Sequence, residues 1–231
     1  MPMMTPYVNI HTHYDNHYDN NEFVEIKNID VDSLVNVDVS HFYSVGIHPW
    51  KVESEELRDS GIEKLGDLVS RHLYDLNFLA LGECGLDRAC EADFEIQKEV
   101  FLKQIVLSEQ IKKPLIIHAV RSYPDIISMR KETKAKQPWI IHGFQANETT
   151  VMQLLRYEGI YLSLGDVLFK NENKAQLLLR TIPLERLFLE TDVAERDIKD
   201  VYERVASFLG VEMDRLRNGI FNNFVKIFGQ I

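Results

Sequence analysis

The stretch Tyr7-Val8-Asn9-Ile10-His11-Thr12-His13 places two histidines at the end of a short, largely apolar run. Such a run predicts a buried β-strand. Because successive side chains of a strand point to opposite faces, His11 and His13 should face the same side. A His-x-His pair on a strand is more often structural than metal-binding, so its meaning depends on the rest of the chain.

Further side chains that could bind a metal end later runs of the same kind, namely Glu83, His118, His142 and Asp192. Each lies at or near the C-terminal tip of a strand-like segment. In a barrel of parallel strands these tips meet on one face, where enzymes of this architecture keep their active sites. Four imidazoles and two carboxylates there would suit two divalent cations. The pattern predicts one metal centre formed by all six residues.

Strands alternating with helices organise the whole chain. Mostly continuous apolar runs, typical of strands buried on both faces, predict strands at 7–13, 23–29, 42–48, 78–83, 115–120, 139–144, 160–164 and 187–192. Helical patterns cover 54–73, 93–112, a segment opening at Ser122, 149–158, 173–181, 200–209 and 214–228. This alternation predicts an α/β fold, a TIM-type (β/α)8 barrel. The barrel should be slightly degenerate, because no helical pattern separates the first two strands.

Composition sets further bounds. The 231 residues fit one domain, 1–231. A net charge of −10 disfavours a broad electrostatic footprint for duplex nucleic acid, yet not a short strand held mainly by metals. Cys84 and Cys90 form no disulfide or metal spacing and predict free thiols in a reducing cytosol. The first residues do not resemble a signal peptide, and no window is long and apolar enough to span a membrane. We therefore expect a cytoplasmic location and no membrane partner.

Several candidates have alternative interpretations. Glu83 could cap the next helix instead of bridging two cations. Glu190 shares the strand face of Asp192 and competes with it for the role of ligand and base, for which Asp192, at the strand tip, is better placed. His48 suits a substrate-phosphate donor more than a seventh ligand, although a loop histidine bonded to the backbone is the alternative. Arg121 could form a bidentate contact to an anionic oxygen or a surface salt bridge.

The remaining histidines, His17, His41 and His72, are expected to be structural or exposed. His-Tyr-Asp-Asn occurs at 13–16 and again at 17–20, and the second copy is interpreted as a polar turn. Asp87, four residues after Glu83, is expected to belong to a turn or to support a ligand.

The motifs in order resemble the TatD family of metal-dependent hydrolases, within the amidohydrolase superfamily. The resemblance spans nearly the whole chain and rests on segments 9–13, 46–49, 81–87, 113–118, 141–144, 183–192 and 223–228. It implies a barrel with two metals, one held by His11, His13, Glu83 and Asp192. The other would be held by Glu83, His118 and His142. Several characterised members of the family are Mg²⁺-dependent deoxyribonucleases.

Three features depart from the family pattern. A helix after the first strand is missing, and Val193-Ala-Glu-Arg leads almost directly from Asp192 into the final helices. Arg121 lies three residues after His118, where the family's arginine usually lies two after. The first two departures should trim the rim of the barrel and leave the site more open.

The expected function is a binuclear hydrolase that cleaves phosphodiester bonds in DNA, with Asp192 as the base and Glu83 between the cations. Its partners would be single-stranded DNA, DNA ends or a small phosphoester, with no obligate protein partner. The ions are expected to be Zn²⁺, Mn²⁺ or Mg²⁺; imidazole ligands favour the first two. The alternatives are an ester, lactone or amide hydrolase on a small substrate, and an inactive barrel kept for interactions.

Overall fold

The computed structural model describes residues 5–14, 22–31, 33, 41–52 and 55–230. Its contacts divide the chain into two compact units. Unit 1 combines Met1–Lys27 with His142–Ile231, and unit 2 is Asn28–Ile141. Each unit is described by itself below, and the single domain expected from the sequence stays a prediction. The second His-Tyr-Asp-Asn copy, with His17, lies outside the described residues.

The described residues form eight strands whose order in the sheet follows the chain. They are β1 Tyr7–Thr12, β2 Phe23–Asp30, β3 Tyr43–Gly46, β4 Phe78–Asp87, β5 Leu115–Val120, β6 Trp139–Ile141, β7 Ile160–Leu164 and β8 Leu187–Leu189. All of the described strand pairs are parallel. Their side chains are mostly buried, as the continuous apolar runs predicted. Parallel strands in sequential order that alternate with helices confirm the (β/α)8 barrel class.

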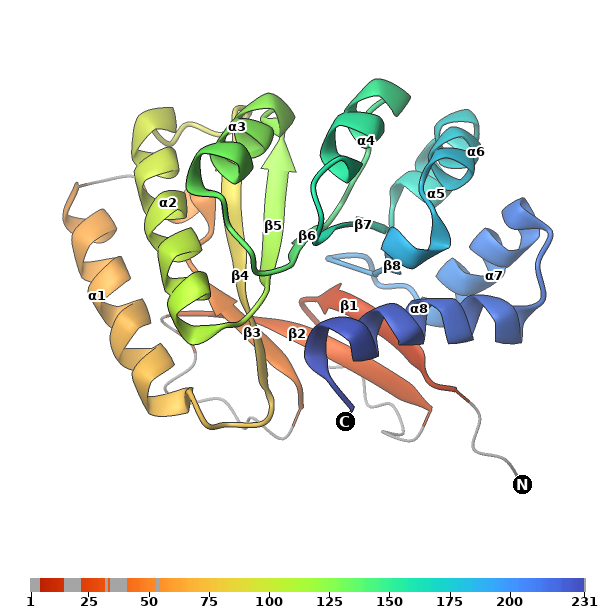
Figure 1. Ribbon diagram of the computed structural model, residues 1–231, viewed down its shortest axis with the longest axis horizontal. Coiled ribbons are helices and arrows are strands. Elements are labelled where there is room, and N and C mark those ends of the chain that lie inside the picture. The colour runs from red at the N-terminus through yellow and green to blue at the C-terminus, as the bar shows by residue number, and fades with distance from the viewer. Residues whose placement is uncertain (1–4, 15–21, 32, 34–40, 53–54, 231) are drawn as a thin grey trace. The chain divides into compact units, whose positions relative to one another are not determined.

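Helices follow most strands (Figure 1). They are α1 Glu55–His72, α2 Phe94–Ile111, α3 Tyr123–Thr133, α4 Glu148–Leu155, α5 Val167–Lys170, α6 Glu172–Thr181, α7 Ile198–Leu209 and α8 Met213–Phe228. Short 3-10 turns, η2 Pro49–Lys51 and η3 Leu184–Arg186, complete the list. The seven predicted helices are confirmed, and the single-turn α5 was not predicted. Of the helices in the described ranges, none has the length and hydropathy needed to cross a bilayer.

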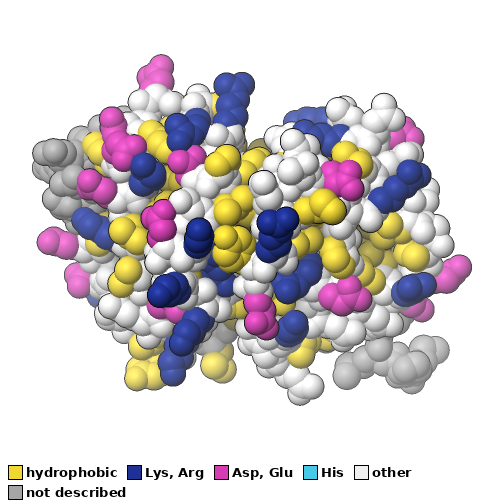
Figure 2. Space-filling view, turned by 45° about the horizontal axis from the view of Figure 1, so that its top comes forward, with side chains coloured by type: hydrophobic (Ala, Val, Ile, Leu, Met, Phe, Trp, Pro, Cys, Tyr) yellow, Lys and Arg dark blue, Asp and Glu magenta, His cyan; other side chains and the backbone are white. Residues whose placement is uncertain are grey.

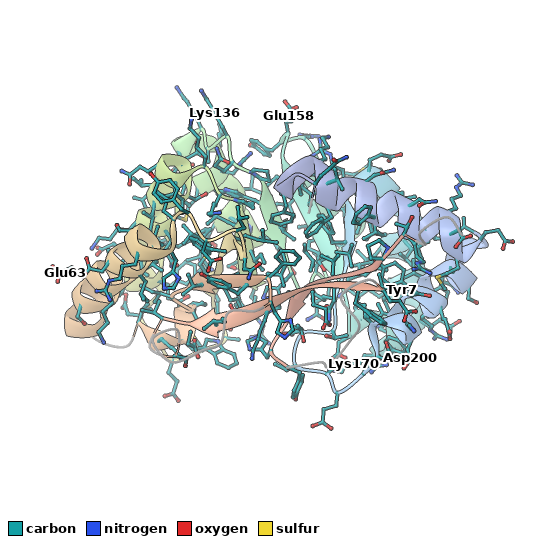
Figure 3. The ribbon with its side chains drawn as sticks, turned by 90° about the horizontal axis from the view of Figure 1, so that it is seen from below. Tyr7, Glu63, Lys136, Glu158, Lys170 and Asp200 are labelled. Carbon is teal, nitrogen blue, oxygen red and sulfur yellow. The ribbon has the colours of Figure 1, made fainter. Side chains whose placement is uncertain are left out.

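In unit 1, β1 pairs with β2 from Tyr7 opposite Phe23 onwards, and β7 pairs with β8. Both α7 and α8 pack against β1 and β8. Tyr7 lies in that interface (Figure 3), with its ring 5.0 Å from the ring of Tyr202 on α7. The Tyr202 hydroxyl is fully buried and bonds both backbone groups of Val8, accepting from its N–H at 3.0 Å and donating to its carbonyl at 3.1 Å. These contacts fix β1, the strand that carries the histidine pair.

In unit 2, β3, β4, β5 and β6 pair in that order, and α2 packs on β4 beside α1. Helix α1 buries Leu65, Leu68 and Val69, while Glu63 projects into solvent (Figure 3). Gln104 of α2 is buried, and its amide bonds both backbone groups of Ile47 at 2.9 and 3.1 Å. Because Ile47 precedes His48, this helix fixes the segment that leaves β3.

Several predicted strands extend too far at their C-terminal ends. The runs 42–48, 139–144 and 187–192 pair only as far as Gly46, Ile141 and Leu189. His48, His142 and Asp192 therefore follow the regular strands, although Asp192 still forms an isolated bridge with Thr12. β4 instead extends past Glu83 to Asp87. Both cysteines are free thiols, as predicted.

Candidate metal centre

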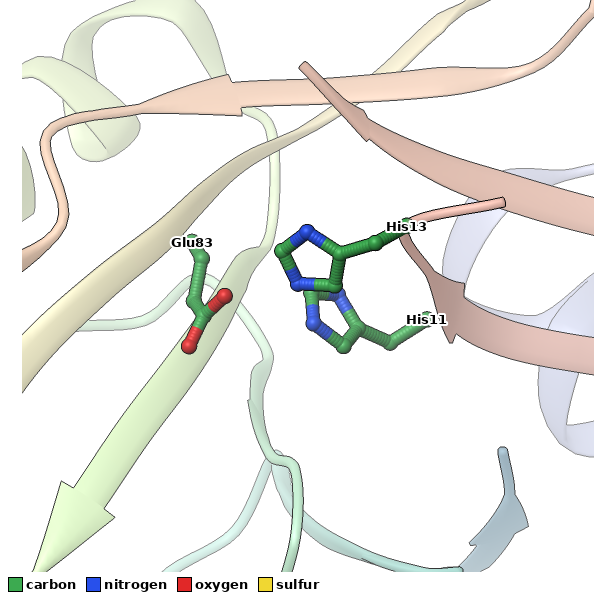
Figure 4. Close-up of side chains that lie close together, drawn as sticks. All are labelled: His11, His13 and Glu83. Atoms are coloured by element: carbon green, nitrogen blue, oxygen red, sulfur yellow. The ribbon is translucent and has the colours of Figure 1, made fainter. Parts of the chain in front are cut away.

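Unit 1 places His11, His13 and Asp192 at adjoining strand ends. The two imidazole rings project to the same side of β1 (Figure 4), with their centroids 5.0 Å apart. The His13 N–H donates to the Asp192 carbonyl at 3.2 Å, and the Asp192 N–H donates to the His11 carbonyl at 3.1 Å. These two backbone bonds align the ends of β1 and β8. The predicted shared face of the histidines is therefore confirmed.

The Asp192 carboxylate lies between the two imidazoles. Its Oδ1 is 3.5 Å from Nε2 of His11 and 3.6 Å from Nε2 of His13. These separations exceed those of good hydrogen bonds. Two ligands about 2.1 Å from a tetrahedral cation lie about 3.4 Å apart. The spacing of these donor atoms therefore fits ligands that share one cation.

His142 joins the same group. Its ring centroid lies 4.3 Å from that of His11, and the candidate ligand atoms of His11, His142 and Asp192 all lie within 4.8 Å of one another. Glu190 is buried beneath it, where Oε1 accepts a hydrogen bond from the Gly143 N–H at 2.5 Å and lies 3.8 Å from His142 Nδ1. Glu190 therefore supports the segment that carries His142.

Buried polar contacts hold Asp192 in an uncommon backbone conformation. Its φ of 53° is left-handed, a region that Asp tolerates better than most residues. The preceding Thr191 donates its N–H to Asn9 Oδ1 at 3.0 Å, and Asn9 Nδ2 donates to Thr191 Oγ1 at 2.9 Å. Asn9 is completely buried and also bonds Glu25 of β2. One sequence feature points to Asn9, because it is a polar residue inside an apolar run.

Unit 2 holds a second set, formed by His48, Glu83 and His118, whose candidate ligand atoms also lie within 4.8 Å of one another. The Glu83 carboxylate (Figure 4) is 4% exposed. Its Oε1 lies 3.0 Å from His48 Nε2 and 2.8 Å from His118 Nδ1, which are hydrogen-bond distances. Its backbone N–H donates to Asn28 Oδ1 at 2.7 Å. Glu83 is thus fixed at both its backbone and its side chain.

Two glycines allow β4 to approach β5 around Glu83. Gly82 and Gly85 have φ values of 149° and 136°, which L side chains rarely adopt. A Cβ at Gly85 would lie 2.1 Å from the His118 carbonyl oxygen, and one at Gly82 would lie 2.6 Å from the Ile116 carbonyl oxygen. Both positions therefore require glycine, and this close approach brings Glu83 to His118.

The hydrogen bonds of His48 determine its tautomer. Nδ1 accepts from the Trp50 N–H at 3.1 Å, so the ring proton is on Nε2, which donates to Glu83 Oε1. In this structure His48 is therefore a hydrogen-bond donor at Nε2, and its predicted role as a donor to a substrate phosphate stays a prediction. The alternative was a loop histidine bonded to the backbone. It accounts for the Nδ1 contact with the Trp50 N–H but not for the Nε2 contact with Glu83.

His118 has a carboxylate at each ring nitrogen. Nδ1 faces Glu83, and Nε2 lies 3.0 Å from Asp87 Oδ2. Burial alone would raise the pKa of Asp87, but hydrogen bonds from Trp50 Nε1, the Ala89 N–H and His118 lower it below its usual value. A cation on Nδ1 would leave Nε2–H to donate to Asp87, the support that metal-binding histidines commonly have. The donor chemistry of both sets therefore fits divalent cations.

The other predicted site residues lie outside both sets. Arg121 is exposed with a left-handed φ of 51°, and none of the ion pairs in the described ranges involves it. His41 is exposed, and His72 lies 3.2 Å from the Tyr43 hydroxyl, so both are as expected. The sequence did not indicate the Trp50–Asp87 bond, which joins residues far apart in the chain.

Comparisons with known proteins identify the family. The model of a family described as TatD related DNase matches residues 18–229. An uncharacterized metal-dependent hydrolase of Buchnera aphidicola is 34% identical over 154 residues, which are 65% of this chain and 58% of that protein. The uncharacterized metal-dependent hydrolase YcfH of Escherichia coli is 29% identical over 202 residues, covering 80% of this chain and 73% of YcfH.

A solved structure gives the same result for the fold. The TatD homologue YjjV of Escherichia coli superposes with a TM-score of 0.82 at 19% identity, covering 99% of this chain and 100% of that one. At this identity the likeness supports the barrel fold alone. The family model, in contrast, covers most of the sequence, including His48, Glu83, His118, His142 and Asp192. The chain therefore belongs to the family of TatD-related DNases.

Proposed function

We propose that this protein is a metal-dependent hydrolase that cleaves phosphodiester bonds of single-stranded DNA or DNA ends. The observation that carries the proposal is the pair of histidine–carboxylate sets at strand ends, one in each unit. Relatives named metal-dependent hydrolases, and a matching family described as TatD-related DNases, support the reaction class.

The proposed ligands are the six residues predicted from the sequence. Unit 1 supplies His11, His13, His142 and Asp192, and unit 2 supplies Glu83 and His118. The proposal requires both sets to serve one centre with two cations, in which Glu83 is shared as the family resemblance implies. Imidazole ligands favour Zn²⁺ or Mn²⁺ over Mg²⁺, which prefers oxygen.

The chain's own residues supply the proton transfer and the orientation. Divalent cations held there would lower the pKa of a coordinated water and stabilise developing negative charge on phosphate. The Asp192 carboxylate, 31% exposed and therefore accessible, would accept the proton from the attacking water. His48 carries its proton on Nε2 and donates it to Glu83 in this structure. When substrate is bound, a phosphate oxygen would replace Glu83 as the acceptor of this hydrogen bond. Arg121, exposed and outside the ion pairs of the described residues, would bind a second phosphate oxygen.

Metal content and activity should be measured together. We expect about two bound cations per chain by elemental analysis, and hydrolysis that disappears on chelation and returns with Mn²⁺ or Zn²⁺. A substrate panel of single-stranded DNA, a p-nitrophenyl phosphodiester and a carboxylic ester would identify the bond. Cleavage of the ester without either phosphodiester would refute the proposed substrate class.

The shared centre needs a separate test. Two Mn²⁺ ions about 3.5–4 Å apart, as in other two-metal sites, would be spin-coupled. Electron paramagnetic resonance of the Mn²⁺-loaded protein should therefore show a coupled pair at two equivalents. Replacing Glu83 with Gln should weaken that coupling, whereas replacing the exposed Glu63 of α1 should not. Two uncoupled Mn²⁺ signals in the unmodified protein would refute the shared centre.

A further inference from the structure

We propose that Trp50 forms a stacking surface for one unpaired base of the substrate strand; this inference rests on the proposed phosphodiester cleavage. The chain has two tryptophans, and they differ sharply in exposure. Trp139 is completely buried, whereas Trp50 is 57% exposed. Trp50 belongs to Gly46-Ile-His-Pro-Trp50 and lies in η2, directly after His48 and Pro49.

The Trp50 ring is held in place despite its exposure. Its Nε1–H donates to Asp87 Oδ2 at 2.6 Å. Its ring meets that of His48 edge to face, with centroids 4.9 Å apart at 84°, and that of His118 at 6.0 Å and 76°. A ring that is already oriented loses little conformational entropy when a flat ligand binds. A single exposed apolar residue is ordinary on a protein surface, but one fixed in this way is suited to recognition.

The ring also lies beside the groups that would bind phosphate. His48 joins Trp50 to the unit 2 set, because its Nδ1 accepts from the Trp50 backbone and its Nε2 contacts Glu83. In a nucleotide the base lies one sugar away from its phosphate. A strand whose phosphate contacts His48 therefore has a base within reach of the neighbouring ring.

The charge of the chain makes such a contact useful. The net charge is −10, and Figure 2 shows basic and acidic side chains interspersed over the displayed face. The net charge therefore disfavours strand affinity from many lysine and arginine contacts. Aromatic stacking adds affinity without net charge and tolerates any base, since every base has a π-face. The partner is an unpaired base, because the faces of a paired base are covered by its neighbours in the duplex.

The experiment compares a 12-residue oligothymidylate with an abasic strand of the same length and charge. With the metal-loaded Asp192→Asn protein, in which cleavage should be at least about 100-fold slower, the oligothymidylate should quench tryptophan emission and the abasic strand should not. Trp50→Phe should abolish the quenching, because the buried Trp139 is then the remaining tryptophan. Equal effects of the two strands on emission would overturn the inference.

Kinetics with the metal-loaded protein give a second readout. Trp50→Ala should raise KM for oligothymidylate about 5- to 150-fold, the range seen for loss of one stacked base. The abasic strand should show no comparable rise. Trp50→Phe keeps an aromatic ring but loses the bond to Asp87, so it should retain most of the affinity. Tyr74→Ala, at a residue that is 90% exposed, is the matched surface control and should change neither KM.

The outcomes separate this inference from the proposed function. If the unmodified protein cleaves neither strand, phosphodiester cleavage is refuted, and quenching in the metal-loaded Asp192→Asn protein still decides whether a base stacks on Trp50. If it cleaves both strands and Trp50→Ala changes both KM values equally, stacking is refuted while the proposed function stands. An equal loss in Trp50→Phe and Trp50→Ala would assign the effect to the Asp87 bond and also refute stacking.

Discussion

Replacing Asp192 with Asn tests the proposed base with little change in shape. Both side chains have the same number of heavy atoms, and Asn also tolerates the left-handed φ of 53° at this position. The substitution removes the negative charge 3.5 and 3.6 Å from the Nε2 atoms of His11 and His13. It also removes most of the basicity of the side chain. Folding should therefore be nearly unaffected, while proton transfer should be strongly impaired.

The expected loss in kcat is at least about 100-fold, within the 10²–10⁴ range of general-base contributions. A 100-fold loss corresponds to about 2.7 kcal/mol at the transition state. The assay is hydrolysis of oligothymidylate at saturating metal, with bound metal quantified in the same samples. Saturation separates the loss of the base from weaker metal binding. Thermal unfolding of both proteins should give midpoints within a few degrees.

Asp200→Asn is the matched control for this experiment. Asp200 is an exposed carboxylate in the first turn of α7 (Figure 3), so the same chemical change there should leave the rate within about twofold. Near-normal kcat in Asp192→Asn at full metal occupancy would refute the role of Asp192 as base. A large decrease in the unfolding midpoint would instead show that the carboxylate has a structural role that we have not assigned.

Three further predictions concern stability. Tyr202→Phe should lower the free energy of unfolding by about 1–3 kcal/mol in urea titrations, because both backbone groups of Val8 lose a buried partner. Burial raises the pKa of Tyr202, and burial together with the hydrogen bond to Asp75 raises that of Tyr43. The folded state then keeps protons that the unfolded state releases, and burial raises the pKa of the Cys84 thiol in the same way, so stability should fall progressively from about pH 8.5 upwards. The urea midpoint measured from pH 8 to 10.5 checks this, and a midpoint that rises with pH would contradict it. If residues 1–231 form one domain, both units should unfold in one coincident transition. Tryptophan emission reports unfolding of Asn28–Ile141, and hydrogen exchange reports unfolding of His142–Ile231.

The sequence predicted the strand interiors well because they are determined by local composition. The runs 115–120 and 160–164 match β5 and β7 residue for residue, since each is a largely apolar segment bounded by residues that favour turns. The C-terminal ends were less accurate because the regular ladders end before His142 and Asp192, beyond which isolated backbone bonds continue. An apolar lead-in does not reveal where a ladder ends, since that depends on the neighbouring strand.

The candidate site was predictable as far as strand geometry determines it. The alternation of side chains along a strand was enough to place His11 and His13 on one face. The Trp50–Asp87 bond was not predictable, because it joins a turn after β3 to the end of β4. The left-handed backbone at Asp192 was equally hidden, since glycine is the residue that usually marks such a conformation.

Each proposed histidine ligand has a carboxylate within its own unit. Asp192 lies beside His11 and His13, Glu190 beside His142, and both Glu83 and Asp87 beside His118. Carboxylates beside metal-binding histidines orient the rings and raise their basicity. Asp87 is placed to do this for His118 through Nε2, whereas the longer distances from Asp192 to His11 and His13 fit a fellow ligand. The same carboxylates concentrate negative charge at the strand ends. An acidic chain that attracts divalent cations there can bring a negatively charged strand to the site through those cations, without a basic surface of its own.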